Sequence, residues 1–99
     1  MLFRSVLTDT KTYSVRIRCV GSRTDAQGDA HELHEVLAHA TAGALVVDDD
    51  FTTVSAPNGQ AWTFVVSATG LTLRVTATGT AGQNVDFKAL FEWTELGGF

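Results

Sequence analysis

The chain of 99 residues is long enough for one domain with one hydrophobic core. Seven Lys and Arg residues against eleven Asp and Glu residues give a net charge of −4, and the pair Arg16 and Arg18 is the densest basic cluster, so we expect no nucleic-acid binding. There is no run of about 18 apolar residues and no signal-peptide pattern at residues 1–7, so we expect no membrane span and production in a cytosol-like compartment.

We divide the chain into an N-terminal arm or edge strand at 1–11 and a single β-sandwich domain at 12–99. Residues 1–7 are short and partly apolar, so they fit either an edge strand of this chain or an arm exchanged with a neighbouring subunit. Because the sequence starts with Met1 and ends just after the last predicted strand, we expect a free-standing small protein.

Residues 12–20 alternate between apolar and polar side chains, which predicts a strand with one buried face. The apolar face holds Tyr13, Val15, Ile17 and Cys19. Cys19 is the only cysteine and cannot form an intrachain disulfide. Its place on the apolar face predicts a buried, unreactive thiol.

The next two segments are a loop and an element with two possible structures. Residues 21–29 (GSRTDAQGD) are polar and bounded by glycines, so we predict a loop that is available to a partner. Residues 30–41 carry apolar side chains at helical spacing but also tolerate a period of two. On this pattern alone a helix is the better fit, but because the rest of the chain has the pattern of strands, we favour a strand for 30–41.

The stretch 43–55 predicts one strand that is interrupted by a turn or bulge at Asp48, Asp49 and Asp50. A turn follows at 56–59, where proline precedes Asn-Gly. Alternating patterns in 61–79 and 84–96 then predict a hairpin and a last strand, which we expect to pair in sequence as a meander. The fold class predicted is all-β: an antiparallel β-sandwich or jelly-roll-like barrel of six to seven strands with little or no helix.

His31, His34 and His39, with Glu32 and Glu35 between them, are candidate metal ligands. His31 and His34 are one residue too close for the helical zinc motif His-Glu-x-x-His, and on a strand they point to opposite faces. The acids of 48–50 lack the spacing of a calcium loop. No Gly-x-Ser-x-Gly motif, phosphate loop or Cys-His pair with a plausible partner is present. We therefore predict no metal, no cofactor and no enzymatic activity.

The two tryptophans are the other candidate functional residues. Trp62 and Trp93 alternate in phase with Phe64 and Phe91, so we expect both in the core. Two alternatives remain open: subunit contacts, where tryptophan is enriched, and sugar stacking on Trp62, Trp93 or Tyr13.

The second half of the chain resembles a module of tailed-bacteriophage virion proteins. The similarity lies in a tryptophan-bearing strand at 61–66, the hairpin pattern Leu-x-Val-Thr-x-Thr-Gly-x-Ala-Gly at 73–82, the aromatic-alanine strand after it, and the closing Glu92 and Glu95. The arginine-bearing strand before the 21–29 loop is similar to the first half of that module.

The resemblance implies a non-enzymatic structural protein of a phage virion that assembles in the host cytoplasm. A head decoration (cement) protein fits best; a small tail, fibre or adaptor subunit, or a carbohydrate-binding module for host attachment, is the alternative. Expected partners are the major capsid protein or tail subunits, and further copies of the chain, with a trimer expected. The residues expected to contact partners are Leu2, Phe3, Val6, Leu7, Arg23, Asp25 and Phe99.

Overall fold

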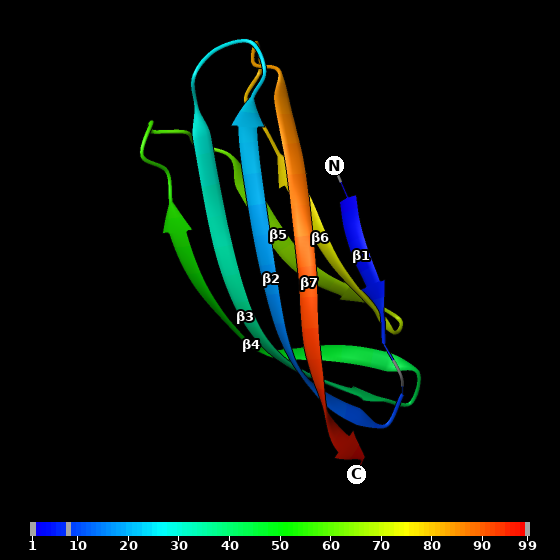
Figure 1. Ribbon diagram of the computed structural model, residues 1–99. Coiled ribbons are helices and arrows are strands. Elements are labelled where there is room, and N and C mark those ends of the chain that lie inside the picture. The colour runs from blue at the N-terminus through cyan, green and yellow to red at the C-terminus, as the bar shows by residue number, and fades with distance from the viewer. Residues whose placement is uncertain (1, 8, 99) are drawn as a thin grey trace.

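The computed structural model describes residues 2–7 and 9–98, which form two antiparallel β-sheets packed as a sandwich (Figure 1). The strands are β1 (Leu2–Val6), β2 (Lys11–Arg23), β3 (Asp29–Thr41), β4 (Ala44–Ser55), β5 (Thr63–Thr69), β6 (Thr72–Thr78) and β7 (Val85–Gly98). One sheet has the order β1-β6-β5 and the other the order β4-β3-β2-β7. The all-β prediction is confirmed: the described residues contain no helix, and the sheets do not close into a barrel.

Strand β2 lies between β3 and β7 and supplies the centre of the core. Its predicted apolar face, Tyr13, Val15, Ile17 and Cys19, is buried, and the residues between them are exposed. Strand β3 shows the same alternation from Ala30 to Ala40, so the period-two interpretation of this segment is confirmed. The apolar residues of this segment also have helical spacing, but β2 and β4 pair with its backbone on both sides and it forms a strand.

The predicted meander of the last three strands is wrong. Strands β5 and β6 form the expected hairpin, but β7 leaves them and pairs along its length with β2 in the other sheet. The apolar faces of both sheets can be buried only against each other, so the chain crosses between layers after β6. Phe87 of β7 then meets the rings of Trp62 and Phe64 edge-on across the sandwich, with ring centroids 5.8 and 5.6 Å apart.

The N-terminal segment is an edge strand of this chain, because β1 pairs antiparallel with β6. Leu7, just beyond it, is buried in the core, and its backbone N–H donates to the Leu71 carbonyl over 2.8 Å. An arm exchanged with another subunit is therefore not what the structure shows for these residues.

The acidic triplet contains a β-bulge. Leu37 pairs with Asp49 and Ala38 pairs with Val47, which leaves Asp48 as an extra residue in β4. The extra residue reverses the facing of every later residue in the strand, so Asp50 turns inward and Phe51 outward. The bulge therefore places Asp50 beside His34 in the interior and Phe51 on the outer face of the sheet.

Candidate interaction surfaces

The outer face of the four-stranded sheet exposes an unusual number of large apolar side chains. These residues are Val20 on β2, Leu37 on β3, Val46 and Phe51 on β4, and Leu90 on β7, and each is at least 41% exposed. They come from all four strands and therefore cover the whole width of the sheet. Large apolar side chains gathered on one exposed face are typical of protein contact sites.

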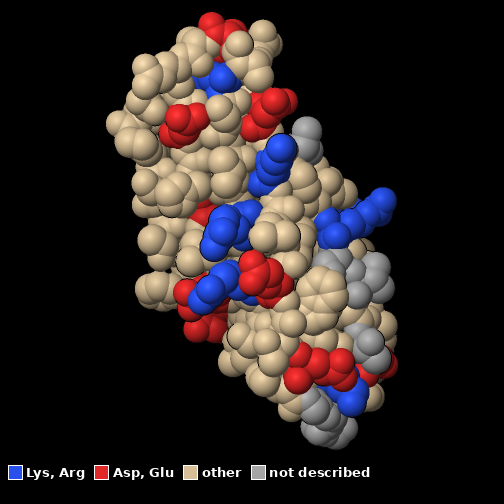
Figure 2. Space-filling model, viewed as in Figure 1, with Lys and Arg blue, Asp and Glu red and all other residues tan. Residues whose placement is uncertain are grey.

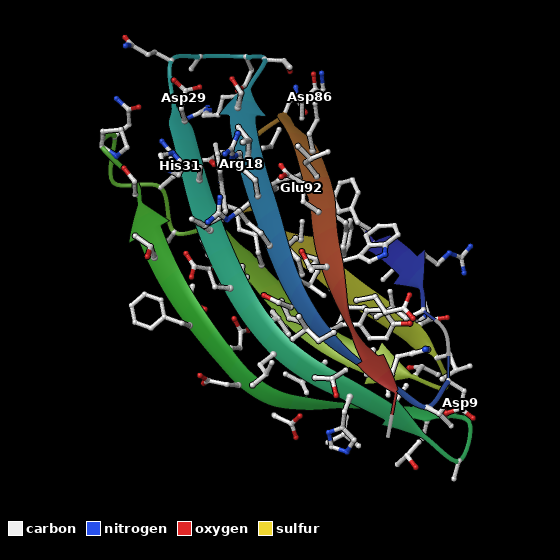
Figure 3. All side chains as sticks on the ribbon, turned by 60° about the horizontal axis from the view of Figure 1, so that its bottom comes forward. Asp9, Arg18, Asp29, His31, Asp86 and Glu92 are labelled. Carbon is white, nitrogen blue, oxygen red and sulfur yellow. The ribbon has the colours of Figure 1, made fainter. Side chains whose placement is uncertain are left out.

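Charged side chains run through the centre of this face, where Figure 2 shows Lys and Arg with acids beside them. Arg16 stands directly opposite Glu35 of β3 and Glu92 of β7. No ion pair within 4 Å joins Arg16 to either glutamate in the described part of the chain. Figure 3 shows Arg18 and Glu92 projecting from neighbouring strands of the same sheet. The charges are thus available to a partner.

A shallow hollow of about 340 Å³ opens between β2 and β7 and is lined by Ser14, Arg16, Glu92, Trp93 and Thr94. Trp93 pairs with the buried Val15, so its side chain lies on the inner face, whereas Glu92 and Thr94 point outward. The indole therefore cannot form a stacking floor among the outward polar groups of this hollow.

Of the three aromatic residues proposed to stack on sugars, two are buried and one is half-exposed. Trp62 is buried, and its indole N–H donates to Gln83 Oε1 over 2.8 Å, as expected of a core residue. Tyr13 is also buried, so neither ring is accessible to a glycan. The prediction of a core position is wrong for Trp93, which is 50% exposed because β7 is the last strand of its sheet and no strand covers that edge.

The predicted N-terminal contact residues do not form one surface. Leu2 is exposed on the outward side of β1, Phe3 is half-buried, and Leu7 lies inside the core. The Val6 side chain and Phe99 lie outside the described residues.

Arg23 and Asp25 of the predicted contact loop bind each other. The Arg23 Nε donates to Asp25 Oδ1 over 2.8 Å, and the backbone N–H of Asn84 donates to Asp25 Oδ2 over 3.2 Å. The carbonyl of Asn84 in turn accepts from the N–H of Thr24 over 2.9 Å. The loop is therefore fastened to the connection between β6 and β7 by the residues that we expected to reach a partner.

The hydrogen bond from Arg23 holds the pKa of Asp25 at about 2, below its usual 3.8, with a further contribution from Asn84. Because the folded-state pKa is depressed, this contribution to stability is complete above pH 3.8 and is lost as the pH falls through 2. We expect Asp25→Asn to remove this part of the acid dependence of unfolding, measured as the difference from wild type in denaturant midpoint between about pH 2 and 5. Asp29→Asn is the control, and an equal effect of both substitutions would contradict the assignment.

His34 lies in a buried hydrogen-bonded cluster that the sequence did not reveal. Its Nε2 is 3.0 Å from Glu32 Oε1, and its Nδ1 is 2.9 Å from Asp50 Oδ1 and 3.1 Å from Thr52 Oγ1. The His34 side chain is 4% exposed. The spacing of Glu32 and His34 on one face of a strand was a usable signal, but the inward turn of Asp50 depends on the bulge.

The other histidines lie elsewhere. His31 is exposed on the opposite face of β3 from His34, as predicted, and is visible at the upper part of the sheet in Figure 3. His39 bonds Asp48 over 2.7 Å. Among residues 2–7 and 9–98 there is no group of three or more His, Cys, Asp or Glu side chains arranged to hold a metal ion.

The thiol of Cys19 is buried, as predicted. Burial, together with the nearby charges of Glu32 and Asp50, raises its pKa to about 12. Since the thiolate is the reactive form, we expect the folded protein not to react with a thiol-specific disulfide reagent at pH 8 and to react completely once unfolded in denaturant. A native thiol that reacts as fast as free cysteine would contradict this assignment.

Comparison with protein-family models, curated proteins and solved structures finds no match for this chain. Within the described residues, no helix of the length and hydrophobicity needed to span a membrane is found. The two sheet faces and the residue pattern of 61–96 are therefore the basis for a functional proposal.

Proposed function

We propose that this chain is a non-enzymatic structural protein of tailed-bacteriophage particles, most closely a head decoration (cement) protein. The observation that carries the proposal is the outer face of the four-stranded sheet, where apolar side chains surround unpaired charges. The resemblance of 61–96 to a virion module supports the same class of protein.

Such a surface suits attachment to an assembled lattice. Full burial of a large apolar side chain contributes about 1.5–3 kcal/mol, so covering Phe51, Leu90 and their neighbours provides a driving force for docking. The unpaired Arg16 and the flanking glutamates select the orientation, because buried charges must meet opposite charges. A protein that binds the assembled shell better than free subunits stabilises the shell by mass action.

The direct test is the protein content of particles produced from the genome that encodes the chain. We expect mass spectrometry of purified particles to detect the chain, and immunogold labelling to place it on the head. Labelling of the tail would assign the alternative role of tail, fibre or adaptor subunit. Absence of the chain from particles, together with quenching of tryptophan fluorescence by a glycan, would overturn the proposal in favour of an attachment module.

A variant tests the surface itself. Leu90→Asp places a charge in the apolar area, and we expect it to weaken co-sedimentation with particles lacking the chain by at least about tenfold, which is about 1.4 kcal/mol. Thr63→Asp, exposed on the other sheet, is the matched control and should bind like wild type. Equal binding by both variants would exclude this face as the contact.

A further inference from the structure

The three-stranded sheet contains no acidic residue. Strands β1, β5 and β6 contain neither Asp nor Glu, but they carry two arginines, Arg4 and Arg74. The remainder of the chain therefore has five of the seven basic residues and all eleven acidic ones. The molecule is strongly asymmetric in charge, with a positive face on the small sheet and a negative remainder.

The two arginines stand directly opposite each other. Arg4 pairs with Arg74 across β1 and β6, and the buried Leu73 and Val75 on either side of Arg74 show that both arginines face outward. Like charges at directly opposed positions destabilise a strand pair. Neither guanidinium has a carboxylate within 4 Å in the described structure, and Arg74 donates only to the hydroxyl of Thr69, over 3.2 Å.

Exposed apolar side chains lie next to this pair. Leu2 is 44% exposed and Val65 is 57% exposed, and both pair with Thr76 in the adjacent row of the sheet. We call the set Leu2, Arg4, Val65 and Arg74 the basic patch. Arginine beside exposed apolar groups is the composition of a contact site that lacks its negative partner.

The same chain displays a matching negative surface along β4, the other edge of the large sheet. Asp49 is exposed and makes no ion pair among the described residues, and Val46 and Phe51, which face the same side of β4, are 44% and 65% exposed. Asp48, whose contact with His39 is exposed, adds a second carboxylate. We call the set Val46, Asp48, Asp49 and Phe51 the acidic edge.

We propose that the basic patch of one copy binds the acidic edge of a second copy. Each patch combines two charges with two apolar side chains, and the charges are opposite in sign. Because the two surfaces differ, the contact is head-to-tail, and it closes into a ring or continues as an open chain. A ring of three would agree with the trimer expected from the resemblance. The inference does not depend on the phage function, because self-association is measured without particles.

The test is the sedimentation of the purified chain at low and high salt. At an ionic strength of about 0.01 M charges act over about 30 Å, and at about 1 M over about 3 Å, so we expect self-association that weakens at least tenfold at high salt. Arg74→Glu and Asp49→Lys should each be monomeric at low salt. A mixture of the two variants should associate again, because each then supplies the surface that the other has lost.

Two controls keep the result interpretable. Arg18→Glu changes the net charge as much as Arg74→Glu but lies on the other sheet, so it should associate like wild type. Arg74→Glu places a carboxylate opposite Arg4, so its melting temperature should equal or exceed that of wild type. A monomeric wild type at low salt, association that is unaffected by Arg74→Glu, or a mixture that stays monomeric would overturn the proposal.

Discussion

Replacing His34 with leucine is expected to lower the free energy of unfolding by about 3–5 kcal/mol, because it removes the residue that hydrogen-bonds the buried carboxyl group of Glu32. The imidazole bridges two carboxyl groups, with Nε2 3.0 Å from Glu32 Oε1 and Nδ1 2.9 Å from Asp50 Oδ1. Without the imidazole, the Glu32 carboxylate has lost its only described partner at a site that is nearly sealed from water. Chemical denaturation monitored by tryptophan fluorescence measures the loss.

The matched control lies three residues away on the same strand. His31→Leu changes the same side chain at an exposed position, and its effect is expected to stay within about 0.5 kcal/mol. Replacing Glu32 as well, in the variant Glu32→Leu with His34→Leu, removes the stranded carboxylate and should recover part of the stability. A His34→Leu protein as stable as His31→Leu would show that the cluster contributes nothing to the fold.

Only part of the His34 cluster could be predicted from the sequence. Alternation along 12–20 was sufficient to predict that strand and its buried face, because period two is a local property, whereas for 30–41 the strand was favoured only because the neighbouring segments are strands. The inward position of Asp50 was not predictable, since it depends on one extra residue in β4 relative to β3. The triplet of acids predicted that a bulge or turn would occur, but not which acid would face the core.

Pairing between distant strands was the second property that the sequence could not supply. The patterns of β6 and β2 are equally suited to receive β7, and only burial of both sheets against each other decides for β2. For the same reason the opposition of Arg4 and Arg74 became visible only with the register of β1 on β6. Half-exposure of Trp93 follows from its place at a sheet edge, which alternation does not encode.

Replacing Gly21 with alanine is also expected to lower the free energy of unfolding. It lies at a buried point of β2, where an added Cβ would be 2.6 Å from Trp62 Cε3 and 3.0 Å from Phe87 Cε1. Both atoms belong to rings in edge contact that join the two sheets, so neither can move freely. We expect Gly21→Ala to cost about 1–3 kcal/mol through overpacking, measured by chemical denaturation.

The cause can be isolated with Trp62→Ala, which should itself cost about 3–5 kcal/mol by leaving a cavity. In the double variant the added methyl group enters the space left by the indole, so the combined loss should be smaller than the sum of the two single losses. Gly79→Ala is the matched control, because its Cβ would meet Phe87 at an ordinary 3.5 Å and the cost should stay near that of a surface change. Additive losses in the double variant would mean that Gly21 is required for its backbone and not for the packing of Trp62 against it.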